Sequence, residues 1–129
     1  MADLVIDASA IIDLILGGEL GDAVYRRIFG SELHAPAHID AEVLSAFGRM
    51  NRAGSQPDQE TLGNLNEFLG APITRHAIGD LLIGAWSRRD NVSLKDAIYI
   101  ELSQKLTMQI ITTDKGMTSI RNAEVISVS

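Results

Sequence analysis

The chain has 129 residues, 46% of them hydrophobic and 22% charged, which is typical of a single soluble domain spanning 1–129. It contains no cysteine, which excludes disulfides and thiolate metal sites and fits a reducing cytoplasm. Because we find neither a signal-peptide pattern nor an apolar stretch of membrane-spanning length, we expect a cytoplasmic protein with no membrane partner.

The first predicted element is a buried strand at Leu4–Ile6, a run of branched or long apolar residues. A short helix follows from Ser9, a suitable N-cap, to Leu16, after which two glycines end it. Apolar periodicity and turn residues then predict a helix over 20–29, a strand over 33–35, and helices over 39–52 and 57–69. On the last of these helices four residues are predicted to face inward: Leu62, Leu65, Phe68 and Leu69.

The second half of the chain continues this alternation of strands and helices. The predicted elements are a short edge strand at 73–74, helices over 77–89 and 94–105, a strand over 109–113, a helical turn over 117–120 and a strand over 125–128. The helix over 77–89 is predicted to bury Ile78, Leu81, Leu82, Ala85 and Trp86. Helices long enough to cross a sheet predict an α/β sandwich with a mostly parallel sheet of four or five strands.

Four acids stand where a strand ends or a helix begins. Asp7 follows the first strand and Asp114 follows the strand at 109–113, whereas Glu42 and Asp96 lie in the first turns of helices. In a parallel sheet, strand ends and the helix starts after them share one edge, where ligands bind. We therefore expect the four carboxylates to converge on one pocket, at helix N-termini that favour negative charge.

Carboxylates gathered in one pocket repel one another unless a cation is present. Mg²⁺ and Mn²⁺ prefer oxygen ligands and keep waters for a substrate phosphate, so this cluster predicts metal-assisted hydrolysis. The net charge of −6 argues weakly against a nucleic-acid partner. Without the four acids the net charge becomes −2, and a bound cation offsets part of the cluster, so the objection weakens.

Each acid also has a structural interpretation that the sequence leaves open. Asp7 is suited to cap the helix that follows it, and Asp114 is suited to begin a turn. Glu42 fits an acid that complements a helix dipole, with Asp40 as the cap, and Asp96 stands where a capping-box acid would stand. Independent caps have no reason to share one edge of a sheet, so the joint placement favours a site.

Four motifs surround the acids, with the sequences VIDASA at 5–10, AEVLSA at 41–46, SLKDAIY at 93–99 and ITTD at 111–114. In this order they resemble the motifs of PIN-domain ribonucleases, and among these the VapC toxins of toxin–antitoxin pairs. The resemblance spans nearly the whole chain. Lys95 departs from the family pattern, in which an aromatic residue often precedes the third acid, and this departure concerns the RNA groove rather than the metal ligands.

The resemblance implies a PIN-like α/β/α sandwich and an endoribonuclease that depends on Mg²⁺ or Mn²⁺. It implies that the metal ligands and catalytic residues are Asp7, Glu42, Asp96 and Asp114. It also implies that the hydroxyls of Ser9 and Thr113 lie near the site and support the carboxylates or a metal-bound water. The implied partners are an RNA substrate (tRNA or ribosomal RNA), a VapB-type antitoxin and a second copy of the chain in a homodimer.

Two other functions stay open at this point. One is a catalytically silent PIN-like adaptor that binds RNA or protein, although all four acids are present and a silent site is free to lose them. The other is a Mg²⁺-dependent hydrolase of small phosphoesters, which the same cluster would serve. Against the second, Ser9 stands two residues after Asp7, where a phosphoaspartate signature would have another Asp.

Basic side chains near the predicted pocket are candidates for contacts with RNA phosphates: Arg49, Arg52, Arg88, Arg89 and Lys95. The alternative is that they are solvated surface, with Arg88 and Arg89 complementing the dipole of their own helix. The three histidines lack ligand spacing, so we expect structural or surface roles for them. Trp86 is expected in the core rather than as a platform for stacked bases.

Overall fold

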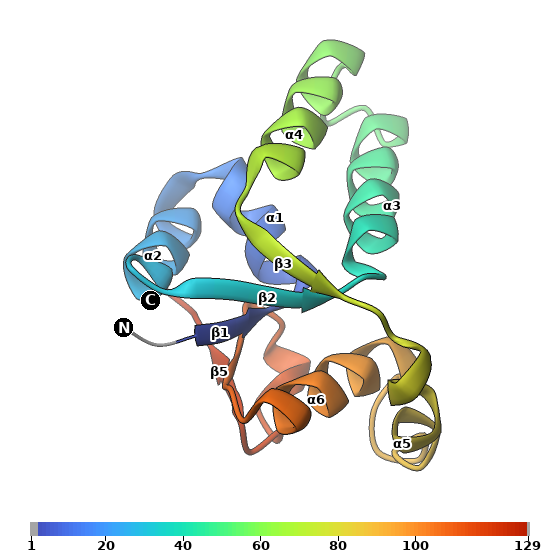
Figure 1. Ribbon diagram of the computed structural model, residues 1–129. Helices are drawn as coiled ribbons and strands as arrows, with labels where there is room; N and C mark the ends of the chain where they lie inside the picture. Colours follow the sequence, from blue (N-terminus) through green and yellow to red (C-terminus); the bar gives the residue numbers. More distant parts are fainter. Residues whose placement is uncertain (1–2, 129) are drawn as a thin grey trace.

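The computed structural model describes residues 3–128, which form one sheet with helices on both faces (Figure 1). Within these residues the sheet has five parallel strands in the order β3-β2-β1-β4-β5. The strands are β1 (Asp3–Ile6), β2 (Glu32–Pro36), β3 (Ile73–His76), β4 (Ile110–Thr112) and β5 (Ala123–Val125). The predicted α/β sandwich is confirmed, and so is the edge position of the strand that begins at Ile73.

The central strand β1 is buried on both sides of the sheet. Its residues Leu4, Val5 and Ile6 are at most 2% exposed. Ile6 is in register with Ile111 of β4, and Leu4 is in register with Leu33 of β2. A strand covered on both faces has no need of alternating polar residues, which explains the continuous apolar run that begins the sequence.

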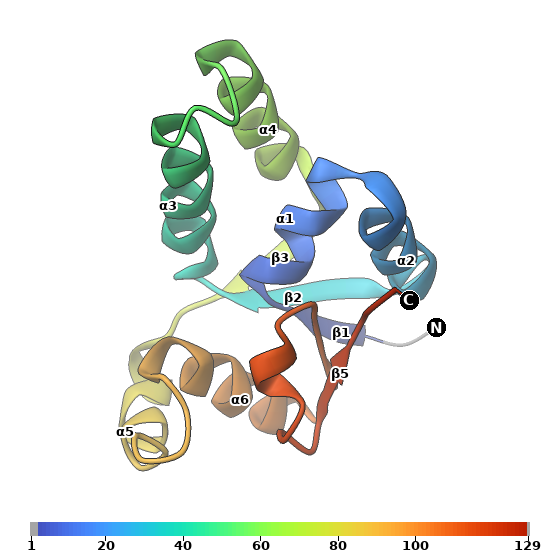
Figure 2. The same cartoon turned by 180° about the vertical axis from the view of Figure 1, so that it is seen from behind.

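The helices lie in two layers, one on each face of the sheet, as the two opposite views show (Figures 1 and 2). One layer contains α1 (Ala8–Leu16), α2 (Gly18–Ile28), α3 (Ile39–Arg52) and α4 (Asp58–Gly70). The other layer contains α5 (Leu82–Trp86) and α6 (Leu94–Leu106). The chain also forms two short 3₁₀ helices, η1 (Gly79–Leu81) and η2 (Lys115–Met117). In the part of the chain that the structure describes, no helix has the length and apolarity needed to cross a membrane.

The predicted helix over 77–89 is wrong in extent, because the chain forms only η1 and the short α5 there. Leu81 and Ala85 are buried as predicted, but Leu82 and Trp86 are 49% and 56% exposed. The Trp86 ring lies instead beside the guanidinium of Arg89, whose Cζ is 4.6 Å from the ring centroid. Because α5 packs mainly on α6, only one of its sides is covered and the others face solvent.

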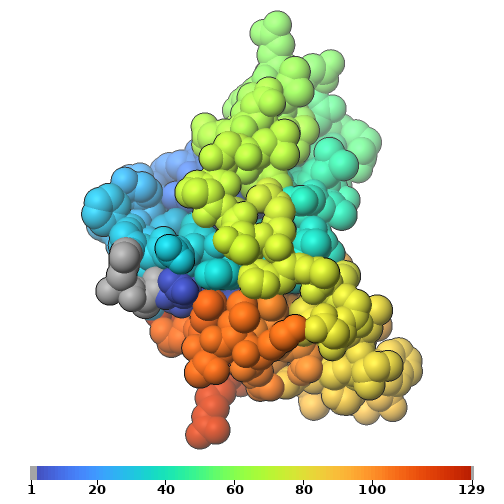
Figure 3. Space-filling model, in the orientation of Figure 1, coloured from blue at the N-terminus to red at the C-terminus, as the bar shows by residue number. Residues whose placement is uncertain are grey.

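The inward face predicted for α4 is correct in part. Phe68 is buried, and Leu65 packs against the core, whereas Leu62 and Leu69 are 61% and 69% exposed. The space-filling view shows the reason, since α3 and α4 rise together above the body of the molecule (Figure 3). A helix in such a projection has few neighbours, and the apolar residues on its outer sides stay in contact with solvent.

Candidate active site

The strand order places a switch point beside β1. The chain leaves β1 for β2 and β3 on one side, then returns to add β4 and β5 on the other side. In parallel sheets such a point opens a crevice at the carboxyl ends of the strands, where ligands bind. Asp7 directly follows β1, and Asp114 lies two residues after the end of β4. Glu42 and Asp96 lie in the first turns of α3 and α6.

These four acids line one pocket of about 660 Å³. The other residues that line it are Ala8, Ser9, Ile12, His38, Ala41, Ser45, Ala46, Arg49, Ser93, Lys95 and Tyr99. The pocket therefore collects side chains from α1, α3, α6 and the segment after β4, which are far apart in the sequence.

Asp7 is the most buried of the four acids, at 6% exposed. It caps α1, because its Oδ1 accepts a hydrogen bond of 3.0 Å from the backbone of Ala10 and one of 2.7 Å from Ser9. The predicted cap at Ser9 is therefore wrong, and Ser9 supports the capping carboxylate instead. Burial nevertheless raises the pKa of Asp7 to about 6, and the nearby charge of Asp96 contributes to this increase.

Asp96 is half-buried, and its pKa is raised mainly by burial and then by the charges of Asp114 and Glu42. The repulsion follows from the placement of the acids around one pocket, where each carboxylate disfavours the ionisation of its neighbours. Asp114 is exposed and begins η2, where its Oδ1 accepts a 2.8 Å hydrogen bond from the Gly116 backbone. Capping and clustering, which the sequence presents as alternatives, thus occur together in the same residues.

Glu42 is held mainly by two residues, Tyr99 and His38, that were not selected as site residues from the sequence. The hydroxyl of Tyr99 donates a 2.7 Å hydrogen bond to Glu42 Oε1, and His38 Nε2 lies 3.4 Å from the same oxygen. Lys95 Nζ lies 3.8 Å from Glu42 Oε2. Spacing could have identified both missed residues: His38 is four positions before Glu42, and Tyr99 is three positions after Asp96, so each shares a helix face with an acid.

Tyr99 is buried, with 1% of its surface exposed. Burial, and then the charge of Glu42, raises the pKa of Tyr99 above its ordinary value, so the phenol keeps its proton. Because it keeps its proton, the hydroxyl remains a donor to the carboxylate.

The hydroxyl next to the acids at the end of β4 is that of Thr112 rather than that of Thr113. Thr112 is fully buried, and its Oγ1 lies 3.1 Å from Ser9 Oγ and accepts a 3.0 Å hydrogen bond from the Asp114 backbone. The hydroxyl of Thr113 instead donates to Asp13 of α1 at 2.6 Å. Both hydroxyls therefore contact α1, Thr112 at its first turn beside Asp7 and Thr113 one turn further along, at Asp13.

The basic residues named from the sequence divide into two groups. Arg49 and Lys95 line the pocket, and Arg52, although also exposed on α3, does not. Arg88 is engaged elsewhere, since its Nε donates a 2.6 Å hydrogen bond to Glu101 and its Nη2 one of 2.8 Å to Gln104. The structure thus brings two of the five candidates to the acids.

The donors in the pocket fit a hard divalent cation. All four are carboxylates, which suit Mg²⁺ and Mn²⁺, and their mutual repulsion is relieved by positive charge between them. Glu42 and Asp96 lie in first helical turns, whose positive dipole ends lower the cost of placing them together.

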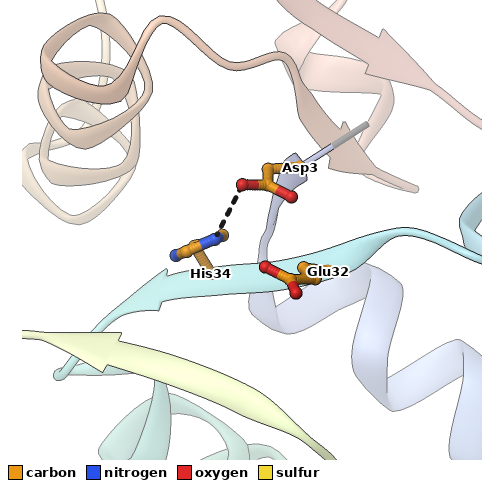
Figure 4. Close-up of side chains that lie close together, drawn as sticks. All are labelled: Asp3, Glu32 and His34. Atoms are coloured by element: carbon orange, nitrogen blue, oxygen red, sulfur yellow. Dashed lines mark ion pairs between the residues drawn. The ribbon is translucent and has the colours of Figure 1, made fainter. Parts of the chain in front are cut away.

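A second group of possible ligands lies toward the opposite edge of the sheet. Ligand atoms of Asp3, Glu32 and His34 lie within 4.8 Å of one another near the starts of β1 and β2 (Figure 4). His34 Nε2 is 3.7 Å from Asp3, and His34 Nδ1 is 2.9 Å from His76 Nε2. This group shares no residue with the pocket, and its histidine, His34, pairs with His76 of β3 as structural side chains do.

Comparison with known proteins assigns this arrangement to a family. The PIN domain model matches residues 4–123. Ribonuclease VapC3 of Mycobacterium tuberculosis (strain CDC 1551 / Oshkosh) is 46% identical over 115 residues, which cover 88% of this chain and 84% of the relative.

Two solved structures have the same fold at low sequence identity. Mycobacterium tuberculosis VapC20, described as a sarcin–ricin loop cleaving toxin, has a TM-score of 0.70 at 17% identity and covers 97% of this chain and 100% of its own. A toxin–antitoxin complex from Klebsiella pneumoniae has a TM-score of 0.68 at 16% identity, and the match covers 95% of this chain and 97% of the chain in that complex. The family model and the close relative together show that this chain belongs to the PIN-domain family and, within it, to the VapC ribonucleases.

Proposed function

We propose that this chain is a metal-dependent endoribonuclease, the toxin of a toxin–antitoxin pair, and that it hydrolyses RNA phosphodiesters in the pocket. The observation that carries the proposal is the presence of four carboxylates, from four separate segments, in one pocket at the carboxyl edge of the sheet. The name of the relative VapC3, a ribonuclease, supports the same chemistry.

The residues that would hold Mg²⁺ or Mn²⁺ are Asp7, Glu42, Asp96 and Asp114. A bound divalent cation supplies an activated water and offsets charge on the phosphate under attack. Ser9 and the Ala10 backbone fix the carboxylate of Asp7 in place. On the substrate side, Arg49 and Lys95 bring positive charge to a pocket that is otherwise acidic, and we assign them to RNA phosphates.

We also propose a VapB-type antitoxin as the partner, a homodimer as the working form and the cytoplasm as the location. The antitoxin is supported by the Klebsiella pneumoniae structure, which is a toxin–antitoxin complex of the same fold. The choice of RNA rests on VapC20, whose description names the sarcin–ricin loop as the target of that toxin. Ribosomal RNA is therefore the first substrate to test, and transfer RNA, which the family resemblance also implies, is tested beside it.

The test is cleavage of a mixed pool of tRNA and ribosomal RNA by the purified chain in Mg²⁺, Mn²⁺ or EDTA. Asp7→Asn and Asp96→Asn variants are assayed beside it. We expect discrete fragments that disappear in EDTA and in both variants, with a loss of at least about a hundredfold, as for removal of a residue that organises a metal centre.

Cleavage that persists in both variants would identify a contaminating nuclease and contradict the assignment of the site. A chain that cleaves small phosphoesters but no RNA would be the phosphohydrolase that the sequence left open. A chain that binds RNA in the presence of Mg²⁺ without cutting it would be the adaptor.

A further inference from the structure

Glu42 differs from Asp7 and Asp114 in how its side chain is fixed. Asp7 and Asp114 each accept a hydrogen bond from backbone two or three residues further along their own segment. A glutamate has one more rotatable bond than an aspartate, so it has more conformations to lose before it can act as a ligand. The contacts that limit Glu42 include a residue from a different helix, Tyr99 of α6.

We propose that Tyr99 is a positioning residue that anchors Glu42 Oε1 and so leaves Oε2 as the oxygen presented to a divalent cation. This inference rests on the proposed function, because it concerns the same site. The two oxygens of Glu42 have different surroundings. Oε1 lies 2.7 Å from the Tyr99 hydroxyl and 3.4 Å from His38 Nε2, whereas Oε2 has the flexible, largely exposed Lys95 at 3.8 Å.

The anchor is rigid because the Tyr99 ring is enclosed. Its exposed fraction is 1%, and the ring of His38 packs on it with a centroid distance of 4.9 Å. A side chain locked by packing holds its hydrogen-bond partner more accurately than a surface residue can. The same ring also belongs to α6, one helical turn after Asp96, so the hydrogen bond ties a ligand on α3 to the helix that carries another ligand.

The phenol thus links α3 to α6 at the site without a cation, beside the contact of 3.3 Å between His38 Nε2 and the Lys95 carbonyl oxygen. Partners of metal-binding side chains typically change metal affinity or activity by about 10- to 100-fold when they are removed. Loss of the Tyr99 hydroxyl should therefore weaken cation binding, while the contacts of the chain with RNA stay as they are.

The test compares Tyr99→Phe with the wild-type chain and with Tyr25→Phe, a control that removes a phenol from an exposed residue of α2. Phenylalanine keeps the ring against His38 and removes only the hydroxyl. RNA cleavage is measured across a range of Mg²⁺ concentrations, and Mn²⁺ binding is measured by calorimetry without RNA. We expect Tyr99→Phe to need about tenfold more Mg²⁺ for half-maximal cleavage and to bind Mn²⁺ about tenfold more weakly, with the KM for RNA unchanged.

A purely structural role for Tyr99 would give a different result. It would lower the melting temperature and the rate at every Mg²⁺ concentration, with the same Mg²⁺ midpoint and the same Mn²⁺ affinity, and that outcome would overturn the inference. Calorimetry also separates the two proposals. If the wild-type chain cut no RNA, the proposed function would fail, and the Mn²⁺ affinities of the two variants would still decide whether Tyr99 positions Glu42.

Discussion

Asp7 combines a structural and a chemical position. It caps α1 through hydrogen bonds from the Ala10 backbone and Ser9, and it also lines the pocket with the other acids. Burial makes its charge expensive, so its pKa rises from 3.8 to about 6 despite these hydrogen bonds. A buried acid of this kind lowers the stability of the folded chain wherever it must ionise.

The sign of the pH effect follows from that pKa. Between pH 4 and pH 6 the folded chain binds more protons at Asp7 than the unfolded chain, so the free energy of unfolding falls as the pH rises. The Asp7→Asn variant does not lose stability in this way, because its side chain does not ionise. Its amide oxygen can still accept the hydrogen bonds from Ser9 and the Ala10 backbone. In EDTA, the variant should be more stable than the wild-type chain at pH 7. The difference in free energy of unfolding between the two proteins should grow by about 2–3 kcal/mol from pH 4 to pH 7. Urea unfolding at a series of pH values measures this.

Other carboxylates titrate in both proteins, so the difference between the two profiles isolates Asp7. Wild-type and variant profiles that run parallel from pH 4 to pH 7 would mean that Asp7 ionises in the folded chain as easily as in the unfolded one. Ser9→Ala tests the same cause in the other direction, because it removes a hydrogen bond that lowers the pKa of Asp7 and leaves the carboxyl group in place, so the stability should fall more steeply with pH.

Arg49 and Arg52 form a matched pair on α3, since both are exposed and only Arg49 lines the pocket. Arg49→Ala should raise the KM for RNA about tenfold and reduce by about one the slope of log affinity against log salt concentration. Arg52→Ala should change neither quantity noticeably. Fluorescence anisotropy with a labelled RNA at several salt concentrations measures both effects, and equal effects of the two substitutions would place the RNA elsewhere.

At the scale of elements, α4 depends on a single buried residue. Phe68 is 3% exposed and has the guanidinium of Arg75 5.0 Å from its ring centroid, whereas its neighbour Leu69 is 69% exposed. Phe68→Ala should reduce the free energy of unfolding by about 3 kcal/mol, because it empties a filled space in the core. Leu69→Ala should stay within about 0.5 kcal/mol of the wild-type value. Similar losses for both variants in urea unfolding would contradict the burial of α4.

The same scale explains why some predicted elements failed. The helix over 39–52 is observed over its whole predicted range, because apolar residues at spacings of four give it a buried side against the sheet layer. The helix over 77–89 has a similar apolar pattern but shrinks to α5, and Leu82 and Trp86 are exposed. A pattern shows which side of a helix is suited to burial. Whether another element arrives to cover that side depends on the rest of the fold.

At the scale of the whole molecule, the strand order brings the four acids together. Asp7 and Asp114 are more than a hundred residues apart, yet β1 and β4 are adjacent and parallel, so the segments after them end side by side. Charge collected in this way destabilises the folded chain until a cation offsets it. Binding a cation should therefore couple to global stability.

Mg²⁺ at ten times its dissociation constant should add about 1.4 kcal/mol to the free energy of unfolding of the wild-type chain. Chelation with EDTA should reverse the gain, and the Asp7→Asn variant should show a much smaller one. Differential scanning fluorimetry over a Mg²⁺ series measures the effect. An equal gain in both proteins would mean that the ion binds outside the pocket, for example at the group formed by Asp3, Glu32 and His34.

The sequence by itself determined four of the five strands, most of the helices and the identity of the acids, whereas the last strand, predicted over 125–128, lies at Ala123–Val125. A short apolar run bounded by turn residues favours a buried strand, and an acid that ends such a run marks the point where the strand leaves the apolar core. The order of the elements also predicted that strand ends and helix starts share an edge, which was enough to name Asp7, Glu42, Asp96 and Asp114 as neighbours of one pocket.

Only the tertiary structure decided which side chains hold those acids. Tyr99 and His38 meet at Glu42 because α3 and α6 pack from opposite faces of the sheet against its carboxyl edge. Thr112 contacts Ser9 beside Asp7, and Thr113 contacts Asp13 one turn further along α1, because the pairing of β4 with β1 places the end of β4 beside the start of that helix. Local patterns fix the direction of a side chain within its own element, whereas contacts between elements depend on how the elements are placed in space.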